Sequence, residues 1–180
     1  MGKRAIILAG GKGTRLKPYT ISLPKPLVPL DETPILEVII MQLKKAGFDH
    51  ITLAVNHMSE IIKDFCEDGS KWSIKIDYSL ETKPLSTMGP LKLINNLPEN
   101  FLVMNGDILT NLDFKSFYEN HVSEKKIFTI SSVQYKSAIV AKDAITKFMI
   151  SPILKNVEMR DGFRAPKFTL IKGEIPSPTP

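Results

Sequence analysis

Short apolar runs alternate with amphipathic segments along the first 134 residues. The apolar runs predict strands at residues 3–9, 50–55, 73–79, 101–104 and 127–133. Apolar residues at helical spacing predict helices at residues 33–46, 58–67, 87–95 and 113–122. Strands that alternate with helices are typical of a largely parallel sheet with helices on both faces, so the pattern predicts an α/β fold with three layers.

The helices carry signals that predict where they begin and which side is buried. Thr33 suits the N-cap of the first helix and Pro34 its first position, while Gly47 suits its end. In the second helix we expect four residues to point into the core, namely Met58, Ile61, Ile62 and Phe65.

The pattern changes after residue 134. Residues 138–150 form an apolar stretch with helical character, and residues 176–180 alternate proline with serine or threonine. We therefore predict a core at residues 1–134 and a divergent tail at residues 135–180, to which the pattern assigns no fold.

Composition narrows the class of protein. The chain of 180 residues suits one domain, and at 43% hydrophobic residues it can bury a core. It has no run of 18 apolar residues, and the apolar run after Met1–Arg4 is too short for a secretory signal. Cys66 is the only cysteine, so no intramolecular disulfide is expected and Cys66 is predicted to be structural. These features predict a cytoplasmic protein without a membrane span.

The formal net charge of +5 does not by itself indicate a nucleic-acid partner. The basic residues are spread along the chain, and no DNA- or RNA-binding motif accompanies them. A polyphosphate substrate would explain the basic residues that cluster locally, and an ordinary solvated surface explains the others. His50, His57 and His121 lack the spacing of metal ligands, so we expect them at the surface or at caps.

A glycine-rich stretch follows the first predicted strand. Gly10, Gly11 and Gly13 permit close backbone approach, so that their N–H groups can cradle an anion. Arg15 adds a bidentate phosphate donor, and Lys25 lies on backbone held extended by flanking prolines. The stretch matches neither the P-loop nor the dinucleotide pattern. A lone GGxG favours a turn with solvated basic residues, whereas the whole string favours a phosphate loop.

The residues from Leu8 to Thr20, followed by Pro24-Lys25-Pro26-Leu27, resemble the signature of the sugar-1-phosphate nucleotidylyltransferases. The resemblance is strongest to mannose-1-phosphate guanylyltransferases and their heptose and glucose relatives, and it extends to about residue 134. It implies a Rossmann-like three-layer αβα fold of the nucleotide-diphospho-sugar transferase type. The family's sugar-binding motifs are not found after residue 135, so the fold is expected to be incomplete on its C-terminal side.

The resemblance also implies an activity. Such enzymes transfer a nucleoside monophosphate from a nucleoside triphosphate to a sugar 1-phosphate, in nucleotide-sugar biosynthesis, with Mg²⁺ as cofactor. Arg15, Lys25 and Asp107 would be catalytic, with Arg15 on the β/γ phosphates and Lys25 at the α-phosphate. The implied nucleotide-binding residues are Leu8, Ala9, Gly10, Gly11, Gly13, Thr14, Arg15, Glu81 and Asn105.

Two carboxylates carry the more specific expectations. Asp107 follows a buried strand and a glycine, a suitable place for a carboxylate that holds Mg²⁺ together with phosphate oxygens; the alternative is a cap of the next turn. Glu81 lies in a segment that resembles the family's base-reading loop. A carboxylate offers only acceptors, which suits the N1–H and N2–H of guanine, so GTP is favoured; the alternative is a solvated loop glutamate.

Two classes of function therefore stay open. The first is an enzyme that resembles the mannose-1-phosphate guanylyltransferases and acts on GTP and a sugar 1-phosphate. The second is a truncated nucleotide-binding remnant, or a partner subunit without turnover. An unpaired sheet edge would also allow pairing with a second copy of the chain, as a homo-oligomer.

Overall fold

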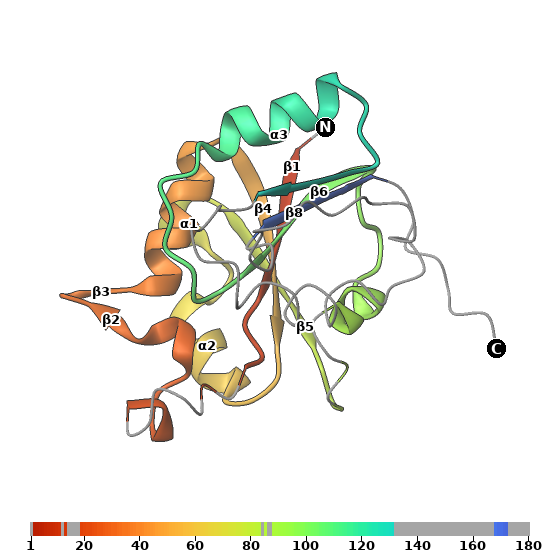
Figure 1. Cartoon of the computed structure of the whole chain (residues 1–180). Coiled ribbons are helices and arrows are strands. Elements are labelled where there is room, and N and C mark those ends of the chain that lie inside the picture. Colours follow the sequence, from red (N-terminus) through yellow and green to blue (C-terminus); the bar gives the residue numbers. More distant parts are fainter. Residues whose placement is uncertain are drawn as a thin grey trace, which may run out of the picture.

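A six-stranded sheet forms the centre of the molecule (Figure 1). The computed structural model describes residues 2–11, 13, 19–83, 85, 88–131 and 168–172. In spatial order the strands are β5 (Lys75–Leu80), β4 (Phe48–Val55), β1 (Lys3–Leu8), β6 (Asn100–Asn105), β8 (Phe168–Lys172) and β7 (Phe128–Ser131). Neighbours among β5, β4, β1 and β6 pair in parallel, while β8 is antiparallel to both β6 and β7. The predicted mostly parallel α/β sheet is confirmed.

Strand β1 lies inside the sheet because its last four residues, Ala5–Leu8, are apolar. Ile6 pairs with Thr52 of β4 on one side and with Val103 of β6 on the other. Alternate residues of β1 point to opposite faces, so Ile7 joins one core cluster and Ile6 the other. Both side chains are fully buried.

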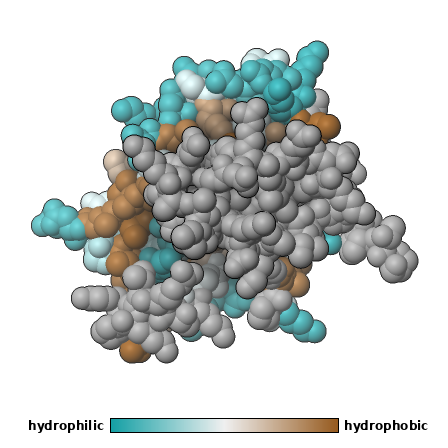
Figure 2. Space-filling view, in the orientation of Figure 1, coloured by the Kyte–Doolittle hydropathy of each residue, from teal (hydrophilic) through white to brown (hydrophobic). Residues whose placement is uncertain are grey.

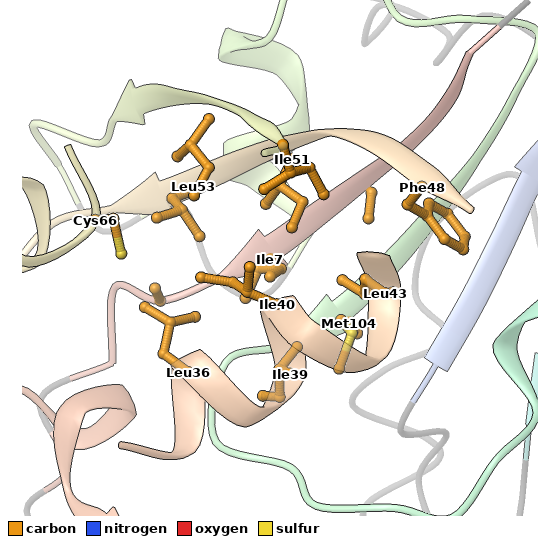
Figure 3. Close-up of a cluster of buried hydrophobic side chains, with 14 of the residues drawn as sticks. Ile7, Leu36, Ile39, Ile40, Leu43, Phe48, Ile51, Leu53, Cys66 and Met104 are labelled. Carbon is orange, nitrogen blue, oxygen red and sulfur yellow. The ribbon is translucent and has the colours of Figure 1, made fainter. Parts of the chain in front are cut away.

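Helices cover one face of the sheet. They are α1 (Ile35–Lys45), α2 (Ser59–Cys66) and α3 (Phe114–Ser123). Figure 3 shows the core that they enclose, with Leu36, Ile40 and Leu43 of α1 facing Ile51 and Leu53 of β4. On the opposite face a short 3₁₀ helix, η5 (Gly89–Leu93), packs Leu91 and Ile94 against Ile6 and Phe101. Both faces of the sheet are thus covered, although among the described residues α-helices cover only one of them.

The start of α1 differs from the prediction. Thr33 does not cap the helix; it belongs to the two-residue strand β3 (Thr33–Pro34), which pairs with β2 (Pro29–Leu30). Pro34 is the N-cap, with no side-chain hydrogen bond. Thr33 is engaged in backbone pairing with Leu30, so the hairpin determines its conformation. At the other end Gly47 follows the C-cap with φ +84°, as expected for the residue that ends a helix.

Two further helix predictions need correction. Among the described residues of the predicted helix 87–95, only the 3₁₀ helix η5 forms, with Pro90 in its first turn and Ile94 as its C-cap. Ile61 of α2 is 38% exposed, since Ile62 and Cys66, one turn apart, form the buried side. In contrast, Asp113 caps α3 by accepting a hydrogen bond from the Ser116 N–H at 3.1 Å, as its predicted start requires.

Strand β8 has no counterpart in the sequence prediction. It comes from the chain beyond residue 134 and lies between β6 and β7. The helical stretch predicted at residues 138–150 lies outside the described residues.

The described surface differs in polarity from one helix to another. In Figure 2 hydrophilic residues cover α3 at the top of the view, and apolar residues gather beside the β2–β3 hairpin at the left. Within the described ranges, no helix combines the length and apolar character needed to cross a membrane.

Candidate active site

Four parallel strands end at the same edge of the sheet. Leu8 at the end of β1 pairs with Ala54 of β4 and with Asn105 of β6, and Val55 of β4 pairs with Leu80 of β5. The residues that follow these strands therefore meet at one edge, where ligands bind in open α/β sheets. They are Ala9–Gly11 after β1, Asn56 after β4, Glu81 after β5 and Gly106–Asp107 after β6.

The glycines of the loop have different surroundings. A Cβ at Gly10 would lie 3.1 Å from the Asn56 Cβ and 3.4 Å from Glu81 Oε2, so its backbone packs against both side chains. A Cβ at Gly11 would meet nothing within 4 Å among the described residues. Gly13 has φ +59°, and Thr20 donates a hydrogen bond to its carbonyl oxygen at 2.8 Å. Gly10 and Gly13 thus pack against other residues, while the space beside Gly11 is open as far as the described residues go.

Lys25 and Asp107 form an ion pair across this edge, through Lys25 Nζ and Asp107 Oδ2. Lys25 begins the 3₁₀ helix η3 (Lys25–Leu27), between buried Pro24 and buried Pro26. The side chains of Lys25 and Asp107 are 32% and 24% exposed, so both remain accessible to a ligand. Gly106 anchors Asp107, because its N–H donates to the Leu8 carbonyl at 2.9 Å.

Asp107 also fits a magnesium ligand by its chemistry. A partly exposed carboxylate is the hard oxygen donor that Mg²⁺ takes, and Mg²⁺ often needs only one or two protein carboxylates beside phosphate oxygens. Within the described part of the chain no group of three or more His, Cys, Asp or Glu side chains is placed to hold a metal. A partly exposed carboxylate such as that of Asp107 suits a cation that phosphate oxygens also coordinate.

Both the backbone and the carboxylate of Glu81 are hydrogen-bonded. Its backbone N–H donates to the Val55 carbonyl at 2.9 Å, which extends the β4–β5 pairing by one bond. Its carboxylate accepts hydrogen bonds from the Leu85 backbone N–H and from Asn56 Nδ2. The side chain is thus oriented, unlike that of a freely solvated loop glutamate.

The structure brings most of the predicted site residues together. Those at or beside the shared edge are Leu8, Ala9, Gly10, Gly11, Gly13, Lys25, Glu81, Asn105 and Asp107. Thr14 and Arg15 lie outside the described residues, so their roles stay predictions. The sequence analysis missed Asn56, and its only signal was a polar residue directly after a buried strand.

The histidines need one correction. His121 is 1% exposed, because α3 packs it against the start of β7, where its Nδ1 lies 2.8 Å from Thr129 Oγ1. His57 is exposed, as expected. His50 lies at the opposite edge of the sheet, with its Nε2 2.7 Å from Asp77 Oδ2.

Asp77 belongs to a polar cluster near the amino ends of the strands. Buried Arg4 donates to Thr52 Oγ1 at 2.9 and 2.6 Å, and its Nη2 lies 3.4 Å from Asp77 Oδ2. Burial raises the pKa of Asp77, but hydrogen bonds from Thr52 and His50, with the charges of His50 and Arg4, outweigh it and lower the pKa. The cluster holds β1, β4 and β5 together far from the glycine loop.

Known proteins resemble this chain in sequence and in fold. The family model described as "Nucleotidyl transferase" matches residues 4–142. Mannose-1-phosphate guanylyltransferase 1 of Arabidopsis thaliana is 42% identical over 126 residues, which are 67% of this chain and 35% of that protein. The catalytic subunit beta of mannose-1-phosphate guanylyltransferase from Xenopus tropicalis is 42% identical over 132 residues, or 71% and 37% of the two chains.

The structural comparison agrees with the sequence. The crystal structure of HddC from Yersinia pseudotuberculosis complexed with GMP-PN matches with a TM-score of 0.68 at 27% identity, over 94% of this chain and 76% of that one. The chain spans about a third of the length of the curated relatives that it matches. The predicted recognition is confirmed: the chain belongs to the nucleotidyl transferase family and, within it, is similar to the mannose-1-phosphate guanylyltransferases.

Proposed function

We propose that the chain is the nucleotide-binding part of a sugar-1-phosphate nucleotidyltransferase that uses GTP. The observation that supports this most is the convergence of three kinds of group at one sheet edge. These are the open backbone of Gly11, the Lys25–Asp107 pair and the oriented carboxylate of Glu81. We assign the Gly11 backbone to the phosphates of a nucleotide, the Lys25–Asp107 pair to the phosphates and the metal bound with them, and the Glu81 carboxylate to the base.

In the proposed reaction an oxygen of the sugar 1-phosphate attacks the α-phosphorus of the nucleoside triphosphate. A bond forms between that oxygen and the phosphorus, and the bond from the α-phosphorus to the bridging oxygen of the β-phosphate breaks. Pyrophosphate leaves with the electron pair, and the nucleoside-diphosphate sugar remains. Catalysis then consists of positioning and of stabilising the developing charge, with no protein nucleophile.

Each residue of the site has a separate proposed role in this reaction. The backbone of Gly10 and Gly11 would lie along the phosphates, since a Cβ at Gly11 would meet no described residue within 4 Å. Lys25 would place its ammonium group at the α-phosphate, where negative charge builds up. Asp107 would hold Mg²⁺, which when bound neutralises phosphate charge. Arg15 is predicted to bind the departing phosphates.

Glu81 would select the base. Its ionised carboxylate accepts but cannot donate, so guanine, with two adjacent donors, fits better than uracil or thymine with one. The comparison with HddC complexed with GMP-PN supports a guanine nucleotide at this site. The sugar stays unassigned, because no described residue carries a sugar-binding motif of the family.

The test is pyrophosphate release by the purified chain with Mg²⁺, each common nucleoside triphosphate in turn, and a pool of hexose and heptose 1-phosphates. We expect the fastest release with GTP and its loss in Asp107→Asn. The matched control is Asp31→Asn: Asp31 is exposed in the β2–β3 turn, and its φ of +57° is one that asparagine tolerates. No release with any pair from a folded chain would refute turnover by this chain and leave a nucleotide-binding remnant or subunit.

A further inference from the structure

Asn56 and Glu81 lie side by side after two neighbouring strands. Val55 pairs with Leu80, so the next residue on each strand occupies the next position at the sheet edge. Asn56 Nδ2 lies 3.4 Å from Glu81 Oε2 and donates to it. This is longer than the usual 2.9–3.0 Å, but hydrogen bonds in ligand-free sites are often long and shorten when the ligand binds.

The two oxygens of Glu81 have different donors. Oε2 accepts from Asn56, and Oε1 accepts from the Leu85 backbone N–H. A carboxylate has about four acceptor positions, two on each oxygen. Each oxygen therefore keeps about one acceptor position for a ligand.

Asn56 also contacts the glycine loop. A Cβ at Gly10 would lie 3.1 Å from the Asn56 Cβ, 3.5 Å from its backbone nitrogen and 3.4 Å from Glu81 Oε2. Asn56 is only partly buried, and a side chain at position 10 would crowd it. The same side chain thus supports both the loop proposed for the phosphates and the carboxylate proposed for the base.

We infer that Asn56 is a positioning residue for base recognition. Together with the Leu85 N–H it holds the Glu81 carboxylate so that its two remaining acceptor positions face the N1–H and N2–H of guanine. The inference rests on the proposed function and deepens it. Because the Asn56 amide is neutral, it orients the carboxylate without cancelling the negative charge that attracts these two donors.

This role has a chemical signature that a general structural role lacks. Inosine triphosphate is GTP without the 2-amino group, so it offers Glu81 only the N1–H. Hydrogen bonds to charged groups are worth enough to make GTP bind about tenfold or more tightly than inosine triphosphate. An unrestrained carboxylate loses much of this preference, whereas general damage to the site weakens both nucleotides alike.

The experiment measures equilibrium binding of GTP and of inosine triphosphate, with Mg²⁺, to the full chain by calorimetry. In Asn56→Ala we expect GTP affinity to fall about tenfold and inosine triphosphate affinity about threefold at most, so that the preference for GTP over inosine triphosphate falls about threefold or more. Asn120→Ala on the exposed side of α3 is the matched control and should keep the wild-type ratio. Circular dichroism checks that each variant is folded.

A double-mutant cycle makes the result decisive. Adding Asn56→Ala to Glu81→Ala should leave the ratio unchanged, because the carboxylate that Asn56 orients is already absent. Preference for GTP in the wild type, retained in Asn56→Ala, would overturn the inference and leave the proposed function standing. Failure of the wild type to bind any nucleoside triphosphate would overturn the proposed function, and the inference with it.

Discussion

Gly106→Ala tests how the loop that carries Asp107 is built. A Cβ at Gly106 would lie 3.1 Å from Ile7 Cγ2 and 3.4 Å from both the Leu8 carbonyl oxygen and Pro26 Cγ. Ile7 is fully buried and Pro26 is buried beside Lys25, so neither can turn away into solvent. Room for the methyl group must come from small shifts of β1, of β6 or of the segment that carries Lys25.

The contacts set the size of the effect. Overpacking a core typically costs about 1–3 kcal/mol, and replacing glycine by alanine returns about 0.4–1 kcal/mol through the unfolded chain. Because the distances are tight but not below 3.0 Å, we expect a net loss of about 1 kcal/mol, or about 2–4 °C in Tm. A shift of Pro26 would also displace Lys25 from Asp107, so the proposed pyrophosphate release should fall several-fold.

Urea unfolding followed by circular dichroism measures the loss, with an unchanged slope to show that the denatured state is the same. A midpoint equal to that of the wild type would refute the packing of Gly106 between Ile7 and Pro26. Normal stability with lowered release would place the effect in the ligand site alone.

Three further predictions follow from other contacts. Gly11→Ala should unfold like the wild type but bind GTP more weakly, because its Cβ meets no described residue and projects where the phosphates are proposed; calorimetry with unchanged affinity would contradict this. The pKa of Asp77 is lowered in the folded chain, so its stabilisation is present above its ordinary value near 4 and is lost as pH falls through the folded value. Asp77→Asn should therefore lower Tm at pH 7, with the difference from wild type shrinking towards pH 3. Burial raises the pKa of Cys66 to about 12, so a thiol reagent at pH 8 should label it only as the chain unfolds, and rapid labelling of the native chain would disprove its burial.

The local pattern of apolar and polar residues was enough to predict much of the fold. The apolar run of β1 and the helical spacing of α1 each identify an element within a few residues, and packing then places both in the core. Strand β8 could not be found in this way, because its place between β6 and β7 depends on pairing across the chain. The start of α1 was misplaced for a related reason, since Thr33 pairs with Leu30 in a hairpin that the capping rules do not include.

The candidate site shows the same division. Lys25 and Asp107 could be predicted because each lies in a recognisable string, and the structure pairs them although 82 positions separate them. Asn56 belongs to no string: its importance comes only from the register that sets it beside Glu81. His121 looked like a surface residue because its burial depends on the packing of α3 against β7, which its neighbours in sequence do not indicate.

Because β8 comes late in the sequence, β6 gains its second neighbouring strand late in synthesis. Phe101 in β6 pairs with Arg4, which is made long before it, and with Ile171, which is made roughly 70 residues after it. At the usual 5–20 residues per second the ribosome needs about 4–14 s to supply that second partner. During this interval β6 has an apolar edge with unpaired backbone groups, and β7 has already emerged without its neighbour in the sheet. A nascent chain is therefore most exposed to pairing with another chain after β6 has emerged and before β8 appears.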